Sequence, residues 1–526
     1  MPADLLIQDA RIHTLAPGEA APAEALAIQD GRVLGVGRAA DLEPLVGPGT
    51  RRLSLGGRTV VPGLNDAHLH LVAFALSLRR VNLVGVPTLA AGLEKVRAAV
   101  ERAAPDDWIL GNGWDKNLWG GLPTRTDLDR VAPRNPVCLS SRDLHVEWAN
   151  TRALELAGVG RETPSPAGGE IVRDADGEPT GILRENAGDL VTGAVPRPTS
   201  EQVEAALLEA LPVAASLGLT SVQTFEAETT LSALQRLRER GGLSLRVCCH
   251  LWKDGLQHAR ALGLRTGFGD EWLRLGHLKL FLDGALGSQT AHMLEPYAGT
   301  TSLGIETLGR QELVDLIREA AEGGIAVATH AIGDAANRKA LDAFAETLPA
   351  WRPAGLRPRI EHVQLLHPAD ARRLGELGIV ASMQPIHATS DWPVAERYWG
   401  ERASLAYAWR TVRDSGAVLA FGSDCPVEPL DPWLGLHAAV TRERADGQPR
   451  GGWHPEQRLD ARAALAAYTV GAAYASGEER LKGSLAPGRL ADLVVLARDP
   501  LESPEGFLGM GVEATVVGGE VVYGAL

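Results

Sequence analysis

The sequence predicts an α/β fold: a barrel of eight parallel strands alternating with helices, and a small β-sandwich built from both ends of the chain. Between residues 62 and 478, short apolar runs alternate with amphipathic stretches such as 311–322 and 368–377. Eight of these runs read as strands, the number that closes a (β/α)8 barrel. Residues 1–61 and 479–526 instead read as short strands joined by tight turns.

Composition and charge narrow the class of protein. The 526 residues are 45% hydrophobic and 22% charged, and the net charge of −14 is spread along the chain. No basic stretch suggests nucleic-acid binding, and no apolar run approaches the roughly 20 residues of a membrane span. The four cysteines have no zinc-finger or disulfide spacing, and the start lacks the pattern of a signal peptide. We therefore expect a cytoplasmic protein that acts on a small molecule. The oligomeric state is open, and a homodimer is one option.

The terminal segments carry hairpin patterns. Residues 25–36 place Asp30 and Gly31 at a turn, and residues 514–517 and 520–523 flank Gly518 and Gly519. A further apolar strand is expected at 491–496. These strands could pair into one sandwich from both ends of the chain. The alternative is two unrelated β-rich tails.

The expected barrel strands place polar side chains at their C-terminal ends. In a barrel of this type, catalytic groups occupy that end. The eight strands end at or near His70, Thr224, His250, Asp283, His330, His362, Gln384 and Asp424.

The first strand runs from Val60 to His70 and is kinked at its start by Pro62 and Gly63. His68 and His70 are two residues apart, so both imidazoles lie on one side of the strand. Two converging imidazoles suit Zn²⁺, and Asp66 on the same side could accept the second N–H of a ligating histidine. The alternative is two histidines satisfied by hydrogen bonds at a strand end.

Lys279 lies in the apolar fourth strand, 273–283. Alternation puts Lys279 on the face opposite the leucines, pointing into the barrel. A desolvated lysine near a metal loses its proton and can take up CO₂ as a carbamate, an anionic oxygen ligand. The alternative is an ion pair between Lys279 and Asp283. A site with two metals and a bridging water fits six strand-end residues, namely His68, His70, Lys279, His330, His362 and Asp424.

Residues 72–200 are too long for an ordinary connection between the first and second strands. They contain strand-like pieces at 108–111 and 136–139. An insertion over the active-site end of the barrel would be placed to select the substrate. The alternative is a peripheral domain without ligand contacts.

Several motifs together resemble the amidohydrolase superfamily, and more narrowly its amidohydrolase-3 branch of YtcJ-like proteins and N-substituted formamide deformylases. The match runs nearly end to end. Its motifs are Pro62-Gly63 with His68-Leu69-His70, Lys279-Leu-Phe-Leu-Asp-Gly-Ala-Leu-Gly-Ser288, His330-Ala-Ile-Gly-Asp334, His362, Met383-Gln-Pro-Ile-His-Ala388, Gly422-Ser-Asp-Cys-Pro-Val-Glu-Pro429 and Lys482-Gly-Ser-Leu485.

The resemblance implies a metal-dependent hydrolase in which His68, His70 and Asp424 bind one metal. It implies that His330 and His362 bind a second metal and that a carboxylated Lys279 bridges the two. We expect one or two divalent ions, Zn²⁺ by preference. Weaker candidates for substrate contact are Trp114, His145, Glu185, Asp283 and His387.

The reaction predicted from these residues is hydrolysis of a linear amide, such as an N-acyl or N-formyl amine. Asp424 would take the proton of the attacking water and deliver it to the leaving nitrogen. Hydrolysis of a carbamate, ester or lactone is an alternative. Deamination of a heterocycle is another, although it needs only one metal and leaves Lys279 unexplained. A scaffold without catalysis is a remote alternative.

Overall fold

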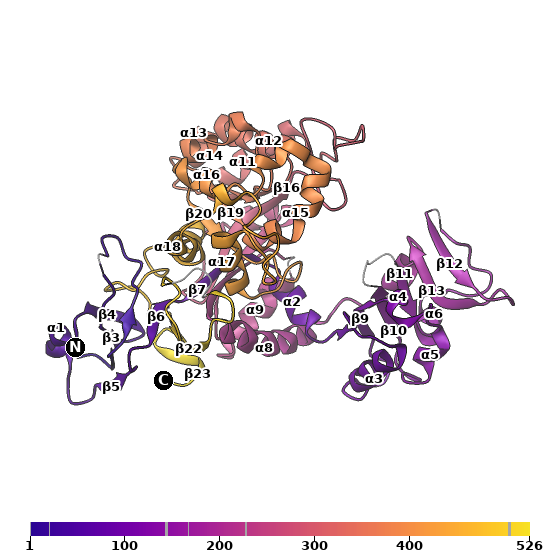
Figure 1. Cartoon of the computed structure of the whole chain (residues 1–526), viewed down its shortest axis with the longest axis horizontal. Coiled ribbons are helices and arrows are strands. Elements are labelled where there is room, and N and C mark those ends of the chain that lie inside the picture. The colour runs from indigo at the N-terminus through magenta and orange to yellow at the C-terminus, as the bar shows by residue number, and fades with distance from the viewer. Residues whose placement is uncertain (1, 20, 142–145, 167, 227–228, 503–506) are drawn as a thin grey trace. The chain divides into compact units, whose positions relative to one another are not determined.

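The computed structural model describes residues 2–19, 21–141, 146–166, 168–226, 229–502 and 507–526. The chain forms two compact units. Unit 1 comprises Met1–Phe74 and Leu207–Leu526, and unit 2 comprises Ala75–Ala206 (Figure 1). In the part of the chain that the structure describes, no helix is long and apolar enough to cross a membrane.

Unit 1 contains the expected barrel. Its parallel strands follow one another in chain order around the sheet, and most of their residues are buried on both faces, as their apolar runs require. Backbone hydrogen bonds from His70 N to Cys425 O (2.8 Å) and from Asp424 N to His68 O (2.7 Å) join the turn after the last strand to the end of the first strand. The eight described strands are β7 (Leu64–Leu69), β14 (Leu219–Thr224), β15 (Arg246–Trp252), β16 (Leu273–Phe281), β17 (Val327–Ala331), β18 (Arg359–His362), β19 (Val380–Met383) and β20 (Leu419–Phe421).

Three strand ends differ from the prediction by two residues or more, and one of them is β16, which stops at Phe281, two residues before Asp283. β15 continues to Trp252, two residues beyond the expected end at His250, and β20 stops at Phe421, three residues before Asp424. Asp424 has a left-handed backbone with φ of 60°, which a β-strand does not accommodate. The turn that presents the Asp424 carboxylate therefore begins before the residue itself.

Helices surround the barrel wherever an amphipathic pattern follows a strand. The expected helix 311–322 is α11 (Arg310–Glu322), whereas 368–377 divides into a 3-10 turn (Pro368–Asp370) and α14 (Arg373–Leu377). The remaining longer helices of the barrel are α8 (Ser200–Ser216), α9 (Thr229–Glu239), α12 (Asp334–Glu346), α15 (Pro385–Trp399) and α17 (Pro432–Thr441).

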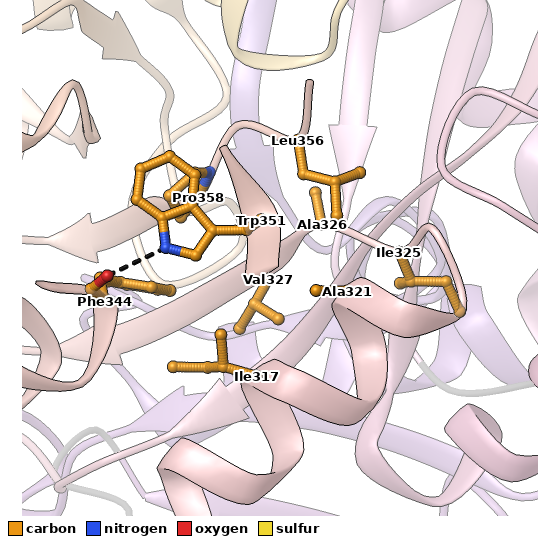
Figure 2. A pocket seen from close by; sticks show the side chains of 9 residues that line it. All are labelled: Ile317, Ala321, Ile325, Ala326, Val327, Phe344, Trp351, Leu356 and Pro358. Atoms are coloured by element: carbon orange, nitrogen blue, oxygen red, sulfur yellow. Dashed lines mark hydrogen bonds between the residues drawn. The ribbon is translucent and has the colours of Figure 1, made fainter. Parts of the chain in front are cut away.

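Figure 2 shows how this outer layer packs on β17. Trp351 ends α13 (Leu348–Trp351), and its indole N–H donates to the carbonyl of Phe344 on α12 (2.9 Å). Trp351 lines a cavity of about 10 Å³ with apolar neighbours that include Ile317 and Val327. A space of this size holds at most about one water molecule, and no titratable side chain lines it, so it is a packing defect and not a binding site.

Both ends of the chain pair in one sheet. The five-stranded sheet has the order β2 (Arg11–Ile12), β6 (Thr59–Pro62), β21 (Leu493–Leu496), β22 (Val512–Val517) and β23 (Glu520–Gly524), and β6 pairs antiparallel with β21. A four-stranded sheet, β4 (Arg32–Gly37), β3 (Ala25–Gln29), β1 (Leu5–Gln8) and β5 (Arg51–Ser54), comes from the first part of the chain alone. A shared apolar core containing Leu26, Val60, Leu493 and Val516 packs the two sheets together.

Pro62 and Gly63 mark the passage from the sandwich to the barrel. β6 ends at Pro62 and β7 begins at Leu64, so the chain changes sheets within two residues. A Cβ at Gly63 would lie 2.2 Å from Oγ1 of Thr220 on β14, which explains the glycine. A buried ion pair also connects the two parts, because the Arg246 guanidinium of β15 donates twice to Asp492 at 2.7 and 2.9 Å.

Unit 2 has a sheet and an apolar core of its own. The described strands are β8 (Val81–Asn82), β9 (Ile109–Trp114), β10 (Val137–Ser141), β11 (Val146–Ala149), β12 (Gly169–Arg173) and β13 (Pro179–Glu185), with α3 (Leu89–Val100), α5 (Arg125–Asp129) and α6 (Thr151–Leu156). Trp114 and Trp148 are buried in this core, and the Trp114 indole donates to Leu139 O (2.8 Å). The long insertion is therefore a folded unit.

Candidate metal centre

His68 and His70 turn the same ring nitrogen toward Asp424. The Nε2 atoms of His68 and His70 lie 3.5 and 3.4 Å from Oδ1 of Asp424. Two ligand atoms that each lie 2.0–2.1 Å from a tetrahedral metal are about 3.3 Å apart. Each imidazole nitrogen therefore lies at a distance from Oδ1 of Asp424 that suits two ligands of one metal ion.

Hydrogen bonds at Nδ1 leave the Nε2 lone pairs free for a metal. His68 Nδ1 donates to Glu361 Oε2 (2.6 Å), and His70 Nδ1 donates to the carbonyl oxygen of Phe225 (2.9 Å). Burial lowers the pKa of His68 to about 4, with Lys279 acting in the same direction against Glu361, so this imidazole is neutral. A lone pair facing a carboxylate oxygen is repulsive unless a cation lies between them. The donor set thus fits a metal ion.

Asp424 connects this pair of histidines to a second hydrogen-bond network. Its Oδ2 accepts from His387 Nε2 (3.1 Å), and His387 Nδ1 lies 3.6 Å from Glu428. Although burial opposes ionisation of Asp424, the hydrogen bond from His387 and the adjacent ring of His70 hold its pKa well below the usual range. Burial likewise opposes protonation of His387, but its two carboxylate partners raise its pKa to about 10. A cationic His387 therefore orients the ionised Asp424.

His330 and His362 lie beside the first pair. Their ring centroids are 4.5 Å apart, and the His362 ring is 4.9 Å from that of His68. His362 Nδ1 donates to Gln384 Oε1 (2.8 Å), whereas His330 Nε2 donates to Gly284 O (3.1 Å). Burial lowers the pKa of both imidazoles, to about 3 for His330.

The backbone of His362 is unusual. Strict alternation would place His362 on the face opposite Glu361, but its φ of 76° turns the side chain toward His68 and His330. One potential ligand atom from each of His68, His362 and Asp424 lies within 4.8 Å of the other two. The expected division assigned His362 to the second metal with His330. The structure places His362 between the two groups.

Lys279 is buried beside these histidines. Its Nζ lies 4.7 Å from the ring centroid of Phe225 and 4.9 Å from that of Phe281. Burial lowers the pKa of Lys279 to about 8, and the nearby Glu361 and Asp424 limit the fall. The ion pair with Asp283 that the sequence left open does not form, because the Asp283 carboxylate accepts backbone N–H groups instead, including those of His292 (3.0 Å) and Gly333 (2.8 Å).

The residue that orients His68 is Glu361, and the expectation for Asp66 was wrong. Oδ1 of Asp66 accepts the backbone N–H groups of His68 (3.0 Å) and Ser423 (3.1 Å), so it secures the strand and not the imidazole ring. The Arg359 guanidinium is fully buried and donates to Glu361 from Nε (2.5 Å) and from one terminal nitrogen (3.1 Å). Alternation in Arg359-Ile360-Glu361 was the signal that both charges face inward.

Phe225 is the second residue that sequence reasoning missed. Its ring stacks between the imidazoles of His68 (centroids 4.3 Å apart) and His250 (3.9 Å), while its carbonyl accepts from His70. Because Phe225 directly follows β14, it lies at the C-terminal end of the barrel, where the sequence placed only Thr224. Because phenylalanine is apolar, sequence reasoning had no chemical reason to select Phe225.

The weaker substrate candidates have different surroundings. Trp114 belongs to the core of unit 2, and Glu185 is exposed at the end of β13. Asp283 is occupied by backbone N–H groups. His145 lies outside the described residues. Of the four described residues, His387 contacts the proposed metal-binding residue Asp424, and Asp283 Oδ1 lies 3.5 Å from Nε2 of His330.

Comparisons with known proteins identify the family of this chain. The model of the amidohydrolase family matches residues 53–523. YtcJ of Bacillus subtilis (strain 168) is 34% identical over 95% of this chain and 96% of its own length. An N-substituted formamide deformylase of Arthrobacter pascens is 30% identical over 99% of this chain and 98% of its own length.

A solved structure agrees as well. The crystal structure of an uncharacterized metal-dependent hydrolase from Pyrococcus furiosus has a TM-score of 0.80 and 32% identity, covering 94% of this chain and 99% of that chain. The chain therefore belongs to the amidohydrolase family and is a metal-dependent hydrolase.

Proposed function

We propose that this enzyme hydrolyses a linear amide bond of a small molecule, an N-acyl or N-formyl amine, with one or two Zn²⁺ ions. The observation that carries the proposal is the convergence of two imidazole nitrogens on one oxygen of Asp424, whose other oxygen is held by His387. This arrangement joins a metal-binding group and a proton carrier in one carboxylate. The name of the Arthrobacter pascens relative, a formamide deformylase, supports the amide.

The residues divide between two ions. His68, His70 and Asp424 would hold the first, and His330 and His362 the second. When bound, the metal polarises the scissile carbonyl and lowers the pKa of the attacking water. Lys279 supports a two-ion site, because its lowered pKa increases the fraction of neutral amine that can react with CO₂ to form a bridging carbamate.

Asp424 moves the proton. Its pKa is well below the usual range, so at neutral pH it is ionised and can accept the proton of the attacking water. The proton then passes to the leaving nitrogen, which an amide needs because an amide anion is a very poor leaving group. His387 fixes the carboxylate through Oδ2 during both transfers.

Ester, lactone or carbamate hydrolysis uses the same residues and is the second candidate. An activated ester needs no proton on its leaving group, so the two reactions differ in how much they depend on Asp424. A deaminase needs no bridging lysine, and a scaffold without catalysis needs no imidazole nitrogens directed at a carboxylate. Neither alternative therefore explains all of these residues.

The test uses the zinc- or manganese-loaded protein with N-formyl, N-acetyl and N-carbamoyl amines, and with lactones and activated esters as controls. Asp424→Asn should lower kcat for amides by about 10²–10⁴, the range for loss of general acid–base catalysis. Esters should lose less. Asp431→Asn is the matched control, because Asp431 caps α17 by accepting from Trp433 N (2.9 Å) and asparagine caps equally well. Equal losses for amides and esters would mean that Asp424 only holds the metal.

A further inference from the structure

Two aromatic side chains end neighbouring barrel strands beside the histidines. Trp252 is the last residue of β15 and Phe281 is the last residue of β16, and their ring centroids are 5.7 Å apart. Alternation places Trp252 on the same face of its strand as His250, and Phe281 on the same face as Lys279. Each aromatic residue is nevertheless 39% exposed. We call Trp252 and Phe281 the aromatic pair.

The aromatic pair lies at one end of a series of adjacent rings. Phe281 is 5.3 Å from His330, and His330 is 4.5 Å from His362. His362 is 6.2 Å from His387, whose Nε2 bonds to Asp424. The proposed metal-binding histidines therefore lie between the aromatic pair and the proton carrier.

Strand order gives the same arrangement. β16 and β20 are separated by three strands in the eight-stranded sheet, so they lie on opposite sides of the barrel. Phe281 ends β16, and Asp424 follows β20. A carbonyl held over the histidines therefore has one substituent directed toward Asp424 and the other toward the aromatic pair.

The chemistry of the reaction decides which substituent is which. The leaving nitrogen must be near Asp424 because it receives a proton from that carboxylate. The acyl substituent must then lie on the side of Trp252 and Phe281. Two charged neighbours on this side, Lys253 next to Trp252 and Glu312, pair with each other, so they offer no free charge to an ionic acyl group.

From this geometry we propose that Trp252 and Phe281 form the subsite for the acyl group and select an alkyl or aryl acyl chain over formyl. The inference rests on the proposed amide hydrolysis. Apolar contact is worth about fourfold in binding for each methylene removed from water. Selectivity should therefore appear when the acyl chain is lengthened, and not when the amine is lengthened.

The experiment compares two substrate series with the zinc-loaded protein. The first keeps 4-nitroaniline and varies the acyl group from formyl through acetyl and butyryl to hexanoyl. The second keeps acetyl and varies the amine from methylamine to hexylamine. The expected kcat/KM rises about threefold to fourfold per methylene in the first series and changes little in the second.

Variants test the residues themselves. Trp252→Ala and Phe281→Ala should flatten the acyl series, whereas Trp252→Phe, which keeps an aromatic face, should retain most of the slope. Phe268→Ala is the matched control, because Phe268 is 62% exposed and precedes β16 at the opposite end of the barrel. Circular dichroism and zinc content confirm that each variant is folded and loaded.

Product binding separates this inference from the proposed reaction. In calorimetry, hexanoate should bind the zinc-loaded protein at least tenfold more tightly than acetate, and Trp252→Ala should remove the difference. If no amide is hydrolysed but hexanoate shows this preference, the reaction is wrong and the apolar subsite stands. Equal binding of the two acids, or an acyl slope that survives in both alanine variants, overturns the subsite.

Discussion

Glu361→Gln is the substitution for which the structure gives the sharpest expectation. The carboxylate of Glu361 accepts from His68 Nδ1 (2.6 Å) and from two nitrogens of Arg359 (2.5 and 3.1 Å), and all three side chains are buried. An amide has one acceptor oxygen. Its NH₂ group must face either Arg359, which only donates, or Nδ1 of His68, which would move the ring proton to Nε2.

Two separate losses follow. The remaining described partners of Arg359 are neutral, namely Gln223 Oε1 (2.6 Å), Ala67 O (2.7 Å) and Ser382 Oγ (2.7 Å), so the guanidinium charge is left buried without a carboxylate. Breaking a buried pair in this way lowers the free energy of unfolding by about 3–5 kcal/mol. Loss of the group that orients His68 should weaken zinc binding by about 10- to 100-fold.

The assay measures both quantities. Urea unfolding of metal-free protein gives the stability, and zinc competition with a chelator gives the affinity. The double variant Arg359→Met with Glu361→Gln should recover much of the stability but not the zinc affinity, because the unpaired charge is gone and His68 is still unoriented. Glu478→Gln is the control: Glu478 is buried against Lys482 (3.0 Å) away from the histidines, so it should lose stability and keep zinc affinity. A Glu361→Gln protein with unchanged zinc affinity would refute the orienting role.

Three further predictions follow from other parts of the molecule. Lys279→Ala should lower zinc content and activity, and a short carboxylic acid should restore part of both; normal zinc content would leave Lys279 a structural residue. Burial opposes ionisation of Glu478, but Lys482 lowers the pKa of Glu478 below its ordinary value of 4.5. The stability that this carboxylate contributes is therefore complete above about pH 4.5, and it is lost as pH falls through the lower folded-state pKa. The difference in urea unfolding between wild type and Glu478→Gln should therefore be constant above about pH 5 and shrink below pH 4.5, and a difference that grew in acid would contradict the pairing. Trp351→Ala should cost about 3–5 kcal/mol in thermal or urea unfolding without changing zinc affinity, because Trp351 packs on the outer side of β17, and a loss below about 1 kcal/mol would mean that the helices collapse into the space.

The pattern of residue types along the chain was sufficient to predict the barrel and the strand ends that carry its polar groups. Apolar runs with a fixed alternation identified the strands, and strand ends of a closed parallel barrel must share one face. This is why His68, His70, His330 and Asp424 could be expected together although hundreds of residues separate them. The turn at Pro62 and Gly63 was also readable, because it depends on residue types alone.

Tertiary structure alone decided which side chains meet. Alternation assigned Asp66 and His68 to one face, but the partner of His68 Nδ1 is Glu361, 293 residues away, because contacts across a barrel depend on strand tilt and register. The direction of the His362 side chain depends on a positive φ that cannot be predicted from the residue type. The burial of Trp114 depends on the separate core of unit 2, and the role of Phe225 on a ring stack. Sequence periodicity fixes a side chain's face within its own strand, whereas its neighbours are set by how the strands close.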